Sequence, residues 1–401
     1  MKGSRLSWVM IALVGAVLGM QGGCSNSPAA QAAAPAKPEP PAAVAPPPPY
    51  DELLTDQARV LAGMMPEVAG RFSNVTGDAL WQAYRAEFDR TWSHSEAERF
   101  QAMRTWRDAE LRRSLSGPCD TLFYPFSGPD IVNAWVLFPD CRRYVMFGLE
   151  HTGAFPKLEG MSPARVDRLL GNVRHVVADL FERNYFITRQ MMSDLETPEL
   201  EGTLPVLALL MARLGSTLTA VTPLELTPDG TFAAPGPGLA ANRANVPAVR
   251  IDTLSPTGMR QEILYFRVQA DDAPLAKHPG MGVFLSSLRP YRTLIKSASY
   301  LMHGPGFTRI RGELLAGSSS ILQDDTGIPF ALLNTPEWDV RLYGKYAKPV
   351  KDFGYAEQAD LAAAFAAPGR ARPLPFTWGY HWRSGISHVM LATRRETARA
   401  R

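Results

Sequence analysis

A strand, a short helix and a second strand follow one another between residues 119 and 149, and this pattern constrains the fold more than any other part of the chain. Apolar runs predict strands at Thr121–Phe126 and Arg143–Leu149, with a helix at Asp130–Phe138 between them. Strands joined by one helix are expected to be parallel neighbours with a right-handed crossover. Pro125 cannot donate to a sheet ladder, so the first strand is expected at a sheet edge or with a bulge. The pattern therefore predicts an α/β fold.

The rest of the chain predicts a mixed α/β fold with a partly parallel sheet and flanking helices. Near the start, apolar side chains at helical spacing over Asp78–Trp92, followed by an S-x-x-E capping box at Ser93–Glu96, predict a helical hairpin. Near the C-terminus, two antiparallel hairpins are expected to be appended to the sheet. One turns at Asp324–Gly327, and the other pairs Phe376–Trp382 with His388–Thr393.

Further elements are expected between these two regions. Helices are predicted from Ser162 onward, at Thr203–Gly215 and at Phe307–Gly317, and strands at Thr217–Leu226, Val249–Leu254 and Gln261–Val268. The pattern of Met281–His303 fits a helix or a strand, and both alternatives stay open.

The first 23 residues have the order of a secretory signal peptide. Lys2 and Arg5 precede an uncharged apolar run, Leu6–Leu18, which is too short to span a bilayer comfortably. Residues 24–49 are rich in Ala and Pro and predict an extended linker. Residues 50–395 are expected to form one large mixed α/β domain, in which residues 233–248 are either a surface loop or a subdomain boundary. Residues 396–401 are expected to be a disordered tail.

The segment Gln21–Cys24 resembles the lipobox of bacterial lipoproteins, in which the cysteine is acylated and becomes the mature N-terminus. This resemblance implies that Cys24 carries a lipid anchor to a membrane, and that Ser25 in the next position directs the protein to the outer membrane. The alternative is cleavage at Ala30-Gln31-Ala32, which would leave a soluble periplasmic protein. The linker favours the anchor, because a domain held off a membrane surface needs a spacer.

If Cys24 is acylated, Cys119 and Cys141 are the remaining cysteines. Each lies just before one of the two expected parallel strands, so both fall at the same edge of the sheet, where a disulfide is geometrically allowed. The formal net charge of +3 is close to balanced and gives no support to nucleic acid as a partner.

Polar side chains are expected where the two parallel strands end. Ser127 and Asp130 follow the first strand, and Asn133 lies one helical turn beyond Asp130. Glu150 and His151 follow the second strand. Ligands of α/β sheets bind outside the carboxyl ends of parallel strands, and a hydroxyl, two carboxylates and an imidazole suit acid–base or nucleophilic catalysis. The alternative is structural, because Ser and Asp commonly cap helices.

A second polar set, His303 with Asp324 and Asp325, is a candidate binding site. Its spacing matches no metal-ligand motif, and turn propensity alone accounts for the two aspartates. The sequence also contains no nucleophile elbow, H-E-x-x-H or P-loop motif. We therefore expect neither a metal nor a cofactor.

Four segments resemble a group of exported bacterial proteins to which no activity is assigned. They are Tyr124–Asp130, Phe147–Glu150, Ser299–His303 and Ile321–Pro329. The likeness covers most of the chain after the linker. Because it implies no activity, it assigns no residue roles.

Two functions are expected, and whether the protein is an enzyme stays open. The first is an exported lipoprotein that binds a small molecule or another envelope component, which needs a mostly apolar cleft with few titratable groups. The second is a hydrolase or transferase that uses the cluster at the strand ends. It needs these side chains in one concave pocket, with a histidine in reach of a carboxylate. In either case the working surface is expected where Asp130 and Glu150 emerge, opposite Cys119 and Cys141.

Overall fold

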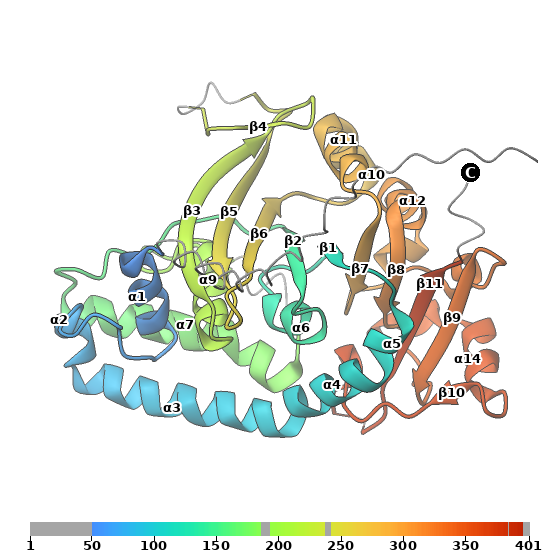
Figure 1. Cartoon of the computed structure of the whole chain (residues 1–401), viewed down its shortest axis with the longest axis horizontal. Coiled ribbons are helices and arrows are strands. Elements are labelled where there is room, and N and C mark those ends of the chain that lie inside the picture. The colour runs from blue at the N-terminus through green and yellow to red at the C-terminus, as the bar shows by residue number, and fades with distance from the viewer. Residues whose placement is uncertain (1–49, 186–192, 237–241, 384, 396–401) are drawn as a thin grey trace, which may run out of the picture. The chain divides into compact units, whose positions relative to one another are not determined.

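An eleven-stranded sheet runs through the molecule in the order β10-β9-β11-β8-β7-β1-β2-β6-β5-β3-β4 (Figure 1). The computed structural model describes residues 50–185, 193–236, 242–383 and 385–395. The expected signal peptide, Cys24, the linker and the C-terminal tail lie outside the described residues. Within those ranges no helix is both long and apolar enough to cross a membrane.

Parallel strands form the centre of the sheet. They are β8 (Ser318–Gln323), β7 (Tyr291–Ile295), β1 (Cys119–Tyr124), β2 (Cys141–Gly148) and β6 (Arg260–Arg267). The prediction that the first two strands are parallel neighbours is confirmed, with Thr121 opposite Arg143. The prediction of an edge strand or bulge for β1 is wrong. The strand ends at Tyr124, so Pro125 follows it and both of its edges can be paired.

Antiparallel strands extend the sheet on both sides. Beyond β6 lie β5 (Val246–Leu254), β3 (Thr217–Leu226) and β4 (Phe232–Ala233). Beyond β8 lie β11 (His388–Arg394), β9 (Trp338–Gly344) and β10 (Ala371–Arg372), of which β10 is parallel to β9. The mixed α/β class with a partly parallel sheet is therefore confirmed.

Helices cover both faces of the sheet, because successive strand residues point to opposite sides. Leu122 and Tyr124 of β1 join one apolar core and Phe123 joins the other. The first core is covered by α1 (Glu52–Leu61), α3 (Ala79–Ser95), α6 (Ile131–Leu137), α7 (Pro163–Arg183) and α9 (Leu204–Arg213). The second is covered by α11 (Pro279–Ser287), α12 (Thr308–Gly317), α13 (Phe330–Leu333) and α14 (Ala359–Ala366). Shorter helices are α2 (Ser73–Thr76), α10 (Asp272–Lys277), η4 (Leu301–His303), η5 (Pro305–Phe307), η6 (Lys351–Ala356) and η7 (Gly379–His381).

The predicted N-terminal helical hairpin is wrong. Helical backbone continues from α3 through η1 (Glu96–Phe100), α4 (Gln101–Trp106), η2 (Arg107–Leu111) and α5 (Arg112–Ser114), which Figure 1 shows as one long curved element. An N-cap lies outside the helical hydrogen-bond pattern, whereas Ser93, the expected N-cap, lies inside α3. Both η1 and η2 are π-helical turns. The ring of Trp92 packs 5.6 Å from that of Phe100, so the apolar stripe runs through the expected break.

Neither predicted C-terminal hairpin forms, because the segments expected to pair with each other have other partners or are not strands. Strand β8 hydrogen-bonds to β7 on one side and to β11 on the other, so neither edge is free for a local partner. The segment Asp324–Gly327 instead leads into α13. Phe376–Trp382 contains a 3-10 turn rather than a strand, and β11 pairs with β9. Antiparallel pairing is present near the C-terminus, but it joins β11 to β8 on one side and to β9 on the other.

The ambiguous stretch 281–303 holds both kinds of element, because α11 is followed by β7. Cys119 and Cys141 form the expected disulfide at the start of β1 and β2, with their Cα atoms 4.5 Å apart. The bridge lies at the end of the sheet opposite to Asp130 and Glu150, which follow the carboxyl ends of the same strands.

Candidate functional site

The order of the strands reverses at β1, because strands are added to the sheet on both sides of it. Such a reversal marks a switch point at the carboxyl ends of the strands. After β1 the chain builds β2 and β6 on one side, and β7 and β8 are later added on the other side. Ligands of open α/β sheets bind at such a switch point. The segments that follow β1, β2, β7 and β8 therefore supply the candidate site.

Asp130 is the centre of a buried polar network at this switch point. Its carboxylate accepts hydrogen bonds from Tyr124 Oη (2.8 Å) and Asn133 Nδ2 (2.8 Å) and caps the start of α6. Lys296 Nζ, at the end of β7, donates to Asp130 Oδ2 at 2.5 Å. The side chains of Lys296 and Asp130 are only 1% and 3% exposed. Asn133 was a predicted binding residue, and the structure places it inside this network.

Lys296 is held from three directions. Besides Asp130, its ammonium group donates to Asn184 O at 2.5 Å and lies 5.4 Å from the centre of the Trp378 ring. Burial lowers the pKa of Lys296, and the negative charge of Asp130 opposes that shift. Removing two charges from water is expensive, so a buried ion pair is weak evidence for a purely stabilising role.

Glu150, which follows β2, lies in the same cavity wall as Asp130 and Lys296. Tyr265 Oη donates to Glu150 Oε2 at 3.0 Å, and Gly148 leaves the space that these two side chains occupy. Burial raises the pKa of Glu150, although the hydrogen bond from Tyr265 acts in the opposite direction.

Three of the four predicted catalytic residues converge. Ser127, Asp130 and Glu150 all line one cavity of about 30 Å³, together with Lys296. A cavity of this size holds a water molecule but no larger ligand. Ser127 Oγ donates to the carbonyl oxygen of Phe147 at 3.1 Å, so its hydroxyl faces no base.

His151, the fourth predicted catalytic residue, lies outside this cavity. Its ring is exposed, with Nδ1 3.1 Å from Arg267 Nη1 and Nε2 3.7 Å from Glu196 Oε1. The nucleophile–base pair that a Ser–His mechanism requires is therefore not formed.

The predicted aspartate pair lies buried at the end of β8. Asp324 accepts hydrogen bonds from the backbone N–H groups of Ser297 (3.0 Å) and Thr326 (3.1 Å), and Asp325 accepts from Tyr300 Oη at 2.6 Å. Burial, assisted by the charge of Asp325, raises the pKa of Asp324 to about 6. These contacts exceed what a simple surface turn requires.

His388, and not the predicted His303, pairs with Asp325. Its Nε2 lies 3.4 Å from Asp325 Oδ1, and both side chains are buried. The Ala347 N–H donates to His388 Nδ1 at 3.2 Å, which places the proton of the neutral ring on Nε2, facing the carboxylate. Burial acts to raise the pKa of Asp325, but His388 and Tyr300 outweigh it and lower that pKa.

His303 lies near Asp325 as well, but without an ion pair. Its ring packs edge-on against the Tyr300 ring, with ring centres 5.2 Å apart. Burial lowers the pKa of His303, although the backbone and the charge of Asp325 act in the opposite direction. In the described part of the chain, no group of three or more His, Cys, Asp or Glu side chains is placed to hold a metal ion. Sequence reasoning missed Lys296 and His388 because strands β7 and β11 reach the site from distant parts of the chain.

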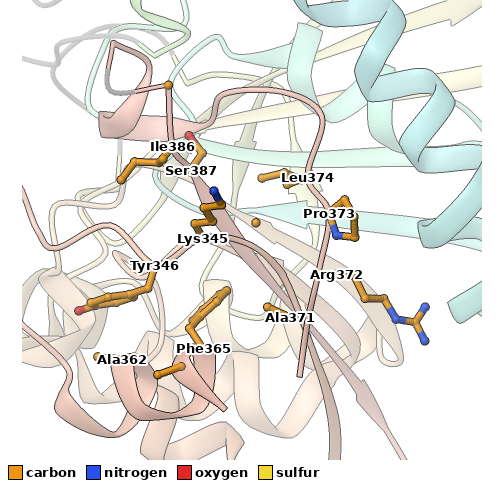
Figure 2. A pocket seen from close by; sticks show the side chains of 13 residues that line it. Lys345, Tyr346, Ala362, Phe365, Ala371, Arg372, Pro373, Leu374, Ile386 and Ser387 are labelled. Atoms are coloured by element: carbon orange, nitrogen blue, oxygen red, sulfur yellow. The ribbon is translucent and has the colours of Figure 1, made fainter. Parts of the chain in front are cut away.

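A larger hollow lies at the β9–β11 end of the sheet, and we call it the edge pocket. Its volume is about 780 Å³. Its lining residues are Gly344, Lys345, Tyr346, Ala362, Phe365, Ala366, Ala371, Arg372, Pro373, Leu374, Gly385, Ile386 and Ser387. Figure 2 shows Lys345 between Ser387 and Ile386 on one side and Tyr346 and Phe365 on the other. Arg372 points away from the hollow in Figure 2. It forms an ion pair with Glu110 at 2.8 Å.

Two further pockets share wall residues with the edge pocket or with each other. The middle pocket, of about 520 Å³, shares Leu374, Gly385 and Ser387 with the edge pocket. The helix pocket, of about 470 Å³, lies along α3 and α7. It shares His94, Ser95, Phe181, Glu182 and Trp382 with the middle pocket. Because neighbouring pockets have walls in common, we call the three together the groove.

Comparison of the chain with protein-family models, with curated proteins and with solved structures gives no match. The function therefore rests on the sequence and on the geometry of the site.

Proposed function

We propose that this protein is an exported lipoprotein of the cell envelope that binds a ligand in the groove. The observation that carries the proposal is the edge pocket, whose volume of about 780 Å³ is in the range of small-molecule sites. Most of its lining is apolar, and the walls include the side chains of Phe365, Ile386 and Leu374. A mostly apolar cleft with few titratable groups is what the binding function requires.

The strand-end cluster supports catalysis less well than the groove supports binding. Its cavity of about 30 Å³ is lined by the Lys296–Asp130 ion pair, and the Ser127 hydroxyl donates to the carbonyl oxygen of Phe147 rather than to a side-chain base. A substrate would have to displace a buried ion pair before it reached these groups.

The N-terminal segment and the disulfide support the location. Lys2 and Arg5 precede an apolar run that ends shortly before Cys24. Disulfides such as Cys119–Cys141 persist mainly in oxidising compartments. We infer that the mature protein begins at acylated Cys24 and is held at the outer membrane.

Ligand binding is tested with N-phenyl-1-naphthylamine, an uncharged apolar dye whose fluorescence rises in an apolar site. We expect saturable binding to the purified protein. Ala362→Trp, which fills the edge pocket, should weaken binding at least about tenfold, the equivalent of roughly 1.4 kcal/mol. Ala363→Trp is the matched control, because Ala363 is exposed on the same helix and does not line the pocket. No saturable binding, or equal effects of the two substitutions, would contradict the proposal.

The anchor is tested separately. Cys24→Ala should release the protein from membranes, and only the unchanged protein should incorporate labelled palmitate. Membrane association of the variant, together with no label in the unchanged protein, would show that Cys24 is not the anchor.

The alternative function, a hydrolase or transferase, is favoured by the convergence of Ser127, Asp130 and Glu150 on one cavity. It predicts turnover of p-nitrophenyl esters or p-nitrophenyl phosphate that Ser127→Ala abolishes without unfolding the protein. Turnover that persists in this variant would remove Ser127 from the mechanism.

A further inference from the structure

We propose that the middle pocket binds the anionic head group of the ligand, a carboxylate or a phosphate ester, through Arg99. The inference rests on the proposed function, because the apolar part of the same ligand would lie in the adjoining edge pocket. It adds the chemical class of the ligand, an amphiphile with one anionic end.

Arg99 is a buried cation without an acidic partner. It lines the middle pocket and is 8% exposed. A guanidinium group carries five N–H donors. Of these, one on Nη2 donates to Leu180 O at 3.2 Å, while Nε is buried and has no hydrogen-bond partner. Across the described ranges of the chain, no carboxylate lies within ion-pair distance of Arg99.

Arg107, two helical turns further on, shows how a structural arginine is satisfied in this fold. It is also 8% exposed. However, it donates to both carboxylate oxygens of Asp108, at 2.8 and 3.0 Å, and to Val136 O at 2.9 Å. An arginine buried in this helical segment can therefore find a carboxylate partner within the chain. Because no described residue supplies the missing partner of Arg99, we assign that role to a bound ligand.

Arg99 lies in the π-helical turn η1, and Arg107 begins the second π-helical turn, η2, so the two arginines share the same kind of backbone. The contrast between them therefore lies in their side-chain partners. The guanidinium group of Arg99 lies 4.8 Å from the centre of the Phe100 ring, a cation–π contact that supplies no counter-charge.

The acidic side chains of the middle pocket do not neutralise Arg99. Glu182 forms an ion pair with Arg383 at 2.9 Å, and Glu98 is exposed to solvent. Burial lowers the pKa of Arg99 to about 10, against the opposing effect of Asp130, so the group stays charged at neutral pH. An unpaired buried charge costs free energy, and a bound anion with charge-assisted hydrogen bonds would offset that cost.

The neighbouring pocket determines the other end of the ligand. Leu374 and Ser387 line both the middle and the edge pocket, so the two pockets meet at these residues, and the proposed ligand extends past them from one pocket to the other. The edge pocket then receives an apolar chain between Phe365 and Ile386. A single-chain anionic amphiphile fits both pockets.

The first test needs no substitution. Decanoate, decyl phosphate and decanol share one apolar chain, and each is titrated to displace N-phenyl-1-naphthylamine from the wild-type protein. We expect at least one anion to bind about tenfold or more tightly than decanol, as a charged hydrogen bond in a buried site provides. The tighter of the two anions identifies the head group. Equal affinities of all three would overturn the inference and leave the proposed function intact, whereas failure of the dye to bind would overturn both.

The second test assigns the effect to Arg99. Arg99→Gln should reduce the affinity for the preferred anion to that for decanol and leave the dye and decanol unchanged, and Arg99→Lys should restore part of the difference. Arg104→Gln is the matched control, because Arg104 lies on the same helix, pairs with Glu96 and does not line the groove. If Arg99→Gln weakens the dye, decanol and the anion equally, Arg99 has only a structural role and the inference is wrong.

Discussion

The buried pair of Lys296 and Asp130 allows a quantitative test of the strand-end network. Lys296→Met removes the ammonium group and leaves the Asp130 carboxylate buried. Breaking a buried ion pair from one side typically costs about 3–5 kcal/mol of unfolding free energy. Asp130 would keep two neutral donors, Tyr124 Oη and Asn133 Nδ2, so we expect a loss near the lower end, about 3 kcal/mol.

Asp130→Asn should cost more than Lys296→Met. It replaces the carboxylate with a neutral amide, so the buried ammonium group loses its counter-charge and keeps only neutral partners, Asn184 O, the new amide oxygen and the face of Trp378. A loss of about 5 kcal/mol is expected, near the upper end for a half-broken buried pair. In the double variant no charge remains unpaired, so its loss should be at least about 2 kcal/mol smaller than the sum of the single losses.

Urea unfolding at pH 7, followed by tryptophan fluorescence and far-UV circular dichroism, measures these free energies. Arg383→Met is the control, because the Arg383–Glu182 pair is exposed and should contribute less than about 1 kcal/mol. If the single losses add in the double variant, or if Lys296→Met costs no more than Arg383→Met, the two groups are not coupled and the description of the network is wrong.

Three further predictions concern the frame of the site. Cys119→Ala should lower the unfolding free energy by about 3 kcal/mol, and thiol titration of the denatured, unreduced protein should detect neither Cys119 nor Cys141. Because the folded pKa of Asp324 is about 6 against 3.8 for the free group, the folded state binds more protons, and stability should fall as pH rises through this window. Asp324→Asn should flatten that slope, and an unchanged slope would contradict the assignment. Gly379→Ala should cost about 2 kcal/mol more than Gly385→Ala, since both have positive φ but only a Cβ at Gly379 would meet the Asp324 carboxylate; equal losses in urea unfolding would be the contrary result.

The sequence alone determined the β1-α6-β2 unit and its consequences. The crossover rule relates two strands that are neighbours in the sequence, so it places Cys119 beside Cys141 at one end. The same rule brings Asp130 and Glu150 together at the other end. These relations follow from local patterns and chain connectivity, and they needed no knowledge of the rest of the sheet.

Tertiary structure decided which groups complete the site. Lys296 meets Asp130 because β7 is inserted beside β1, and His388 meets Asp325 because β11 lies against β8. Both pairings join residues far apart in the chain, and strand order over such separations is set by the packing of the whole sheet. Arg99 is a buried residue of the π turn η1, a backbone change that no periodicity of the sequence marks. The groove was likewise beyond sequence reasoning, because its walls come from α3, α7, α14 and the segment before β11, which only the folded chain brings together.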